Sequence, residues 1–187
     1  MCTVHIGKFS QKYTKYSRRV FSGTLFFLIF VNMDSRSTIS ADKDLRYMKE
    51  ALREAEKALK DGEVPVGAVV VCNDHIIGRG YNQVERLNDP TAHAELLAIT
   101  AATHHLGNKL LEGCTLYVTV EPCPMCASAL YWARPDRIVF ATSDPKRGYR
   151  LFQPSLLHPR TQIMQGILEE LAQSLLHSFF ESLRKKL

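Results

Sequence analysis

The chain has 187 residues, of which 45% are hydrophobic and 23% are charged, values that suit one well-cored globular domain. Its formal net charge of +5 equals the contribution of five basic residues that precede Met33 with no acid among them, Lys8, Lys12, Lys15, Arg18 and Arg19. The rest of the chain is formally neutral, so net charge is no argument for nucleic-acid binding, and the odd number of cysteines favours a reducing compartment over a disulfide framework.

Residues 1–33 differ in composition from the rest and are interpreted as an N-terminal extension. The apolar stretch at residues 21–31 is too short to cross a membrane and is close in length to the hydrophobic region of a signal peptide. No Ala-x-Ala-like cleavage site follows it, and Met33 directly precedes a polar segment. We therefore favour a start codon assigned too far upstream, with a targeting or anchoring segment as the alternative, and expect a cytoplasmic protein without a membrane partner.

Residues 42–187 are predicted to form the functional domain, which opens with a helix and a hairpin. Apolar residues recur at helical spacing after Asp42, and Asp61-Gly62 ends the pattern. The apolar run at 66–71, the turn residues Asn73-Asp74 and the returning run at 76–81 predict two antiparallel strands, at least one of them buried on both faces.

Helices and strands are expected to alternate through the remaining chain. The predicted elements are a helix at 92–106 with Thr91 as its cap, a strand at 116–120, a helix at 123–133, a strand at 137–141, a weak strand near 161–164 and a helix from 167 to about 185. This order predicts an α/β fold, a three-layer α/β/α sandwich around a mixed sheet of about five strands. The active site is expected at strand ends beside helix starts.

Three residues in this alternating part have the chemistry of an open zinc site. His93, Cys123 and Cys126 supply one imidazole and two thiolates. Structural zinc takes four protein ligands, whereas catalytic zinc takes three and leaves one position for water, whose pKa falls to about 7. We therefore predict one catalytic Zn²⁺ per subunit.

Glu95 is the carboxylate that this site needs for proton transfer. Residues two apart point to nearly opposite faces of a continuous helix, so His93 and Glu95 converge only where a helix begins. Cys123 and Cys126, three apart, share a face in the first turn of the next helix, where the helix dipole and a metal both favour thiolate. The spacing thus predicts two helix starts meeting at one ion.

Two other interpretations of these cysteines stay open. A Cys-x-x-Cys pair is also found in thioredoxin-like redox sites, although the usual flanking pattern is missing here. A closed structural zinc site would recruit a fourth ligand from Cys72, Cys114, His104 or His105. The two cysteines border apolar runs and suit small core or strand-end positions, and the two histidines lie at a polar helix end.

These motifs resemble the cytidine-deaminase-like superfamily and, within it, the bacterial tRNA adenosine deaminases. The resemblance covers residues 42–187 and rests on blocks at 63–68, 80–82, 89–95, 115–119 and 121–126, and on Asp144, Lys146 and Gly148. It implies a zinc-dependent homodimer that deaminates the wobble adenosine of a tRNA anticodon to inosine. It also implies that His93, Cys123 and Cys126 hold zinc and that Glu95 carries protons.

The substrate contacts implied by the resemblance are Asn82, Val66, Asp144 and Lys146. Asn82 would contact the flipped base, and Asp144 and Lys146 would lie near the anticodon loop. The alternatives are that Asn82 is only a turn residue and that the segment at 144–146 is only a solvated loop. Local cations at 146, 147, 150 and 184–186 are predicted to follow tRNA phosphates.

Residues 131–135 and Pro124 also look like bacterial guanine deaminases, which act on the free base. The block at 63–68, the loop at 144–148 and the basic C-terminus favour the tRNA enzyme, so guanine deaminase is the alternative function. A non-catalytic partner subunit is a third hypothesis, which the presence of Glu95 disfavours. Leu130, Tyr131 and Trp132 are expected either to bury between subunits or to form ordinary core.

Overall fold

A computed structural model describes the backbone from Gly23 to Lys185 and the side chains from Ala41 onward. The five basic side chains of the predicted extension therefore lie outside the described residues. Within these bounds, no helix combines the length and the apolar character that crossing a membrane requires. The chain from Ser40 onward forms one compact unit, and this unit contains every feature considered below.

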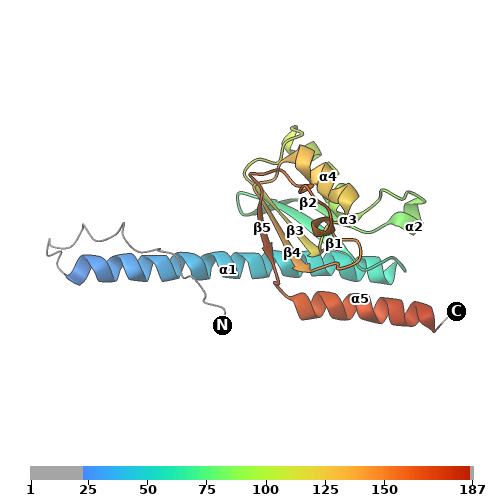
Figure 1. Cartoon of the computed structure of the whole chain (residues 1–187), viewed down its shortest axis with the longest axis horizontal. Helices are drawn as coiled ribbons and strands as arrows, with labels where there is room; N and C mark the ends of the chain where they lie inside the picture. Colours follow the sequence, from blue (N-terminus) through green and yellow to red (C-terminus); the bar gives the residue numbers. More distant parts are fainter. Residues whose placement is uncertain (1–22, 186–187) are drawn as a thin grey trace, which may run out of the picture. The chain divides into compact units, whose positions relative to one another are not determined.

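Helices and strands alternate as the sequence predicts (Figure 1). In chain order the elements are α1 (Gly23–Lys60), β1 (Gly67–Cys72), β2 (His75–Tyr81), α2 (Val84–Leu87), α3 (Ala94–Leu106), β3 (Cys114–Val120), α4 (Pro124–Ala133), β4 (Arg137–Thr142), a single 3-10 turn (Tyr149–Leu151), β5 (Gln162–Gln165) and α5 (Glu169–Arg184).

The strands form one five-stranded mixed sheet in the order β2-β1-β3-β4-β5. β1 pairs antiparallel with β2 and with β3, whereas β3–β4 and β4–β5 are parallel. Both parallel connections carry a longer crossover than the hairpin between β1 and β2, as parallel pairing requires. The predicted α/β fold with a mixed sheet of five strands is confirmed.

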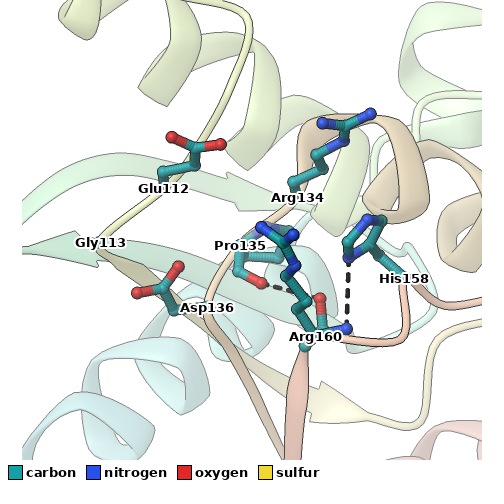
Figure 2. Close-up of a pocket in the computed structure, with 8 residues that line it drawn as sticks. Glu112, Gly113, Arg134, Pro135, Asp136, His158 and Arg160 are labelled. Atoms are coloured by element: carbon teal, nitrogen blue, oxygen red, sulfur yellow. Dashed lines mark hydrogen bonds between the residues drawn. The ribbon is translucent and has the colours of Figure 1, made fainter.

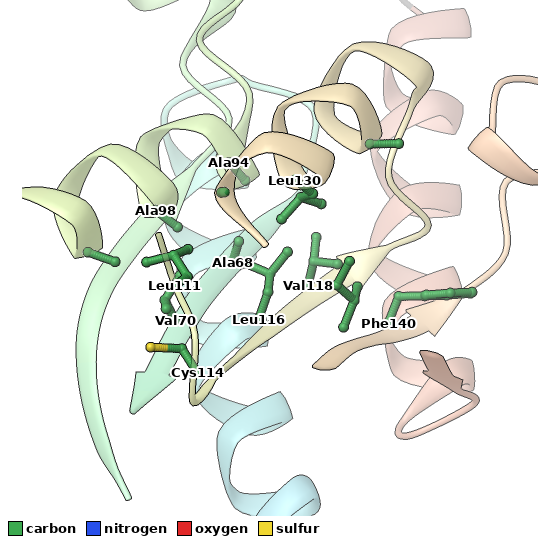
Figure 3. Packing of buried hydrophobic residues seen from close by; sticks show 14 of the residues in the cluster. Ala68, Val70, Ala94, Ala98, Leu111, Cys114, Leu116, Val118, Leu130 and Phe140 are labelled. Carbon is green, nitrogen blue, oxygen red and sulfur yellow. The ribbon is translucent and has the colours of Figure 1, made fainter. Parts of the chain in front are cut away.

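The two faces of the sheet bury different helices, because successive side chains of a strand point to opposite faces. One face carries residues such as Ala68, Leu116 and Phe140 and packs against α3 and α4, as Figure 3 shows. The other face carries residues such as Val69 and Tyr117 and packs against the second half of α1 and the start of α5. Since β1, β3 and β4 are covered on both faces, they are apolar nearly throughout.

The structure differs from the sequence-based expectation at the start of α1, at the cap of α3 and in two short elements. α1 begins at Gly23 instead of near Asp42, and no glycine or proline lies between Thr24 and Lys60 to interrupt it. The short helix α2 and the 3-10 turn were not predicted, since neither is long enough to show a period. α3 is preceded by His93 as its cap residue, so the prediction of Thr91 as the cap is wrong.

Close contact between β2 and α3 brings the start of α3 beside the end of the strand. A Cβ added at Gly80 would lie 2.3 Å from the Ala94 carbonyl oxygen, and one at Gly78 would lie 2.4 Å from that of Ala98. Side chains at these positions would therefore push the helix away. The two glycines hold the first turn of α3 against the strand that leads into Asn82.

Candidate active site

His93, Cys123 and Cys126 come together where α3 and α4 begin. His93 is the cap residue of α3 and Cys123 that of α4, and both have extended backbone conformations. Cys126 lies in the first turn of α4 and is fully buried. The ligand atoms of the three residues lie within 4.8 Å of one another, so two helix starts meet at one point as predicted.

The spacing of these atoms fits a tetrahedral zinc ion. Ordinary Zn–S and Zn–N bonds around a tetrahedral ion place a nitrogen and a sulfur ligand roughly 3.5 Å apart. Nδ1 of His93 lies 3.5 Å from Sγ of Cys126 and 3.7 Å from Sγ of Cys123. No fourth His, Cys, Asp or Glu of the described chain joins this cluster, which leaves a coordination position open.

The alternative ligands of a closed site lie elsewhere. Cys72 ends β1 and pairs in register with Cys114 at the start of β3, whereas the cluster lies beyond the other end of β3. His104 and His105 are exposed in the last turn of α3, opposite the end that His93 precedes. These four residues therefore lie away from the cluster and do not complete a closed zinc site.

The two thiols of the cluster have opposite pKa shifts. Hydrogen bonds from Cys126 and His93 lower the pKa of Cys123, so this thiol ionises readily. The Cys123 sulfur and burial raise the pKa of Cys126, because a second thiolate beside the first is unfavourable. A divalent cation would allow both to ionise, and a thiolate is the form that binds metal.

Glu95 lies in the first turn of α3, two residues after His93, and is only 4% exposed. Burial raises the pKa of its carboxyl to about 7, and the nearby Cys123 acts in the same direction. The carboxyl also interacts with the Cys126 thiol, which brings it to the metal cluster although it is not a member. The site therefore holds three ligands and one separate carboxyl group.

Asn82 and Val66 lie beside this cluster through backbone hydrogen bonds. The Asn82 N–H donates to the Val66 carbonyl oxygen at 3.0 Å, and the next residue, Gln83, donates to the Ala92 carbonyl oxygen at 3.0 Å. Ala92 directly precedes His93. Asn82 is 7% exposed, and its amide nitrogen donates to the buried carboxylate of Glu63 at 3.0 Å. Asn82 is thus a fixed buried residue and not a solvated turn residue.

The loop after β4 is attached to the site by Glu121. This carboxylate, only 4% exposed, accepts hydrogen bonds from the backbone N–H groups of Asp144 and Arg150 and from the Arg150 guanidinium at 2.8 Å. Since Glu121 lies two residues before Cys123, one side chain joins the loop to the metal-ligand turn. Sequence reasoning did not identify Glu63 or Glu121 as individual residues, because burial of an acid is visible only after folding.

Within this loop the predicted tRNA contacts have different surroundings. Asp144 accepts hydrogen bonds from the N–H groups of Lys146 and Arg147 at 2.9 and 3.0 Å, so it organises the turn. The Lys146 and Arg147 side chains are exposed. Arg150 instead binds Glu121, Ser143 and Gln165, and its contact with phosphate stays a prediction.

The hydrophobic residues after the cysteine motif divide between core and surface. Leu130 is fully buried in the core against the sheet, which is the second of the two alternatives expected for it. Tyr131 and Trp132 are 36% and 72% exposed, and their rings pack edge to face with centroids 5.6 Å apart. Only these two aromatic residues remain available for a contact between subunits.

A cavity of about 360 Å³ lies at the opposite end of the sheet and is not part of this site. Figure 2 shows that Arg134 and Arg160 line it together with Glu112 and Asp136, so positive and negative side chains are balanced. Arg134 follows the last turn of α4, and Asp136 directly precedes β4. The metal cluster lies at the first turn of α4, so the helix separates the two.

Comparison with known proteins gives an independent view of these residues. Residues 41–142 match the family described as the cytidine and deoxycytidylate deaminase zinc-binding region. A tRNA-specific adenosine deaminase of Bacillus subtilis (strain 168) is 46% identical over 149 residues, which cover 77% of this chain and 92% of that protein. One of Aquifex aeolicus (strain VF5) is 45% identical over 146 residues, covering 75% and 96% respectively.

Two solved structures are similar as well. One comes from biochemical and structural studies of A-to-I editing by tRNA:A34 deaminases at the wobble position of transfer RNA. It has a TM-score of 0.66 and 41% identity, and covers 70% of this chain and 99% of that chain. The other is guanine deaminase from Bacillus subtilis, with a TM-score of 0.50 and 44% identity over 52% of this chain and 63% of that one.

Proposed function

This chain belongs to the zinc-binding cytidine and deoxycytidylate deaminase family, and we propose that it hydrolyses the wobble adenosine of a tRNA anticodon to inosine. The observation that carries the proposal is the pairing of a three-ligand metal cluster with a buried carboxyl group that does not join it. Hydrolytic deamination needs both parts. The names of the relatives supply the substrate class, tRNA, which the geometry alone does not specify.

His93, Cys123 and Cys126 would hold one zinc ion per subunit, since all three ligands come from a single chain. When bound, zinc lowers the pKa of water and so supplies the nucleophile at neutral pH. The first turns of α3 and α4 support this arrangement, because their N–H groups and dipoles favour the negative charge that two thiolates bring. The ligand side chains are held by two rigid helix starts, so little reorganisation is needed when metal binds.

Glu95 would move the protons of the reaction. Hydrolysis adds water across the C6–N1 double bond of adenine, with one proton passing from water to N1, and the C6–N6 bond then breaks as a second proton reaches the departing amine and ammonia leaves. A carboxyl group that is shielded from solvent and adjacent to the cluster can accept and then return a proton without losing it to bulk water. Its position two residues after His93 keeps the carboxyl group next to the metal ligands, where the reaction would take place.

The remaining residues would bind the anticodon. Asn82 and Val66 adjoin the metal cluster and would contact the flipped base, whereas Asp144 would shape the loop that presents Lys146 to the anticodon backbone. We further propose that residues 42–187 are the catalytic domain and residues 1–33 an extension outside it. A tRNA substrate makes the cytoplasm the proposed location.

A homodimer is part of the same proposal. Trp132 is 72% exposed, and the aromatic pair that it forms with Tyr131 lies near the end of α4, the helix whose start carries both cysteine ligands. Exposed aromatic pairs are costly in water and are enriched at the centres of protein interfaces.

Guanine deaminase is the second candidate, supported by the 44% identity to the Bacillus subtilis guanine deaminase over half of this chain. The C-terminal helix α5 distinguishes the two candidates. It ends with exposed Arg184 and Lys185, whereas an aromatic tail that closes a small pocket is expected of a guanine enzyme. Exposed cations suit a phosphate-rich substrate.

One assay separates the candidates. The purified full-length protein is incubated with transcribed tRNA-Arg that carries an A-led anticodon, with guanine and with cytosine, and released ammonia is measured. Ammonia from the tRNA alone, together with inosine at the first anticodon position, supports the proposal. Ammonia from guanine alone would replace it with the second candidate, and ammonia from none of them would support the non-catalytic partner subunit.

A further inference from the structure

Glu63 is a buried acid beside the site, and its hydrogen-bond partners are neutral groups. It is 1% exposed and lies in the segment between α1 and β1. One carboxylate oxygen accepts the backbone N–H of Arg86 at 2.7 Å, and the other accepts the side-chain amide of Asn82 at 3.0 Å. No Lys or Arg side chain of the described residues forms a salt bridge with it, although Glu54, Glu121 and Asp44 all have such partners.

These contacts determine which end of the Asn82 amide faces the site. A carboxylate offers only acceptors, so the NH₂ end of Asn82 must face Glu63 and the carbonyl Oδ1 must point away from it. Oδ1 accepts no hydrogen bond from the described residues. Since every buried side-chain N or O atom of these residues has a partner, Oδ1 must reach open space.

We infer that Glu63 is a positioning residue that presents Asn82 Oδ1 to the substrate as a hydrogen-bond acceptor. The inference rests on the proposed function, in which Asn82 contacts the nucleotide. It adds what determines whether the acceptor or the donor end of the Asn82 amide faces the nucleotide. An Asn amide free to rotate would present either an acceptor or a donor. Holding the NH₂ end at a buried carboxylate keeps Oδ1 available as the acceptor for a donor of the nucleotide, such as an amino group of the base or a ribose hydroxyl.

A reciprocal exchange between the two residues tests this polarity. In Glu63→Gln, the oxygen of the new side chain must still accept from the Arg86 N–H, so its NH₂ group faces Asn82 and turns the Asn82 amide around. In Asn82→Asp, two carboxylates face each other. The double variant E63Q/N82D restores one donor and one acceptor between the side chains and again leaves an oxygen towards the substrate.

Each single variant is expected to lower kcat/KM by about tenfold or more, the value for a hydrogen bond to a charged group. The double variant should recover at least about tenfold relative to the poorer single variant. A purely structural role of Glu63 lowers Tm and kcat/KM together, whereas the positioning role lowers kcat/KM in folded, zinc-containing single variants whose Tm stays close to that of the wild type. Zinc content and Tm are measured for every variant, so loss of metal or of folding is separated from loss of recognition.

Glu54→Gln is the matched control. Glu54 is another buried acid, bonded to Lys57 and Arg79 away from the metal cluster, and its replacement should lower Tm and change kcat/KM by less than about twofold. Recovery of kcat/KM in E63Q/N82D, relative to single variants that are folded and hold zinc, supports the inference. A double variant no better than the poorer single variant overturns it.

The wild-type protein keeps this result separate from the proposed function. If it deaminates guanine and not tRNA, the proposed function fails, and the same four variants measured on guanine still decide the role of Glu63. If it deaminates tRNA and the exchange gives no recovery, only the inference about Glu63 fails.

Discussion

Replacing Glu95 with glutamine should abolish turnover while zinc stays bound. The substitution removes one buried carboxyl group and keeps the size of the side chain, so no cavity forms. Glu95 lies outside the group of His93, Cys123 and Cys126, and the metal should therefore keep all its ligands. Since glutamine replaces a buried ionisable group with a neutral one, Tm should fall by no more than a few degrees.

The expected loss of kcat is large because no other group described near the site is free to transfer the protons in place of Glu95. A positioned proton donor or acceptor accelerates a reaction by roughly 10²–10⁴. The other buried acids near the site, Glu63 and Glu121, are both committed to hydrogen bonds with backbone N–H groups and neighbouring side chains. Because Glu95 would serve in two proton transfers, we expect kcat to fall by at least about 10³, which corresponds to about 4 kcal/mol of transition-state stabilisation.

Single-turnover deamination of the anticodon stem-loop, with zinc measured by atomic absorption on the same sample, checks both halves of the prediction. The variant should contain one zinc per subunit and bind substrate with an unchanged Kd. Release of zinc by the Glu95 variant would show that this carboxylate helps to hold the ion. A kcat within tenfold of the wild type would show that another group transfers the protons.

Four further outcomes are expected. Cys123→Ala should lose zinc and with it the stability that metal binding gives. With metal at 100 times its Kd in the wild type, the free energy of unfolding should fall by about 2.7 kcal/mol and Tm by roughly 5–11 °C. Calorimetry with and without chelator measures this, and an unchanged Tm with zinc retained would contradict it. Trp132→Glu should convert a dimer to a monomer in sedimentation at micromolar concentration, and a wild-type monomer under zinc-replete conditions would refute the interface. Replacing Lys146 and Arg147 together with alanine should reduce the slope of log K against log salt for tRNA binding by about 1.5, whereas an unchanged slope would mean that neither contacts phosphate. Glu121→Gln should raise KM for tRNA several-fold with zinc retained, because it loosens the loop and not the cluster, and a change confined to kcat would count against that role.

The alternation of helices and strands could be predicted because burial on both faces leaves long apolar runs in β1, β3 and β4. The turn at Asn73 and Asp74 was equally readable, since both residues adopt positive φ, as a two-residue hairpin turn requires. The exact residues at which helices begin were harder to predict from the sequence. The cap of α3 is His93 because Thr91 is held by Asp89 in a local turn, a competition between hydrogen bonds that spacing does not reveal.

The metal ligands could be predicted because their pattern lies within short segments of the chain. It consists of two thiols three residues apart and of an imidazole with a carboxylate two residues after it. The sequence alone therefore determined the kind of site and the family. Only the tertiary structure decided what surrounds the site. Glu63 holds the Asn82 amide in one orientation. Glu121 binds the loop of Asp144 to the metal-ligand turn, and Arg150 is part of this contact. The physical reason is that burial and hydrogen-bond partners join residues 19 to 29 positions apart, and neither quantity belongs to any one segment of the chain.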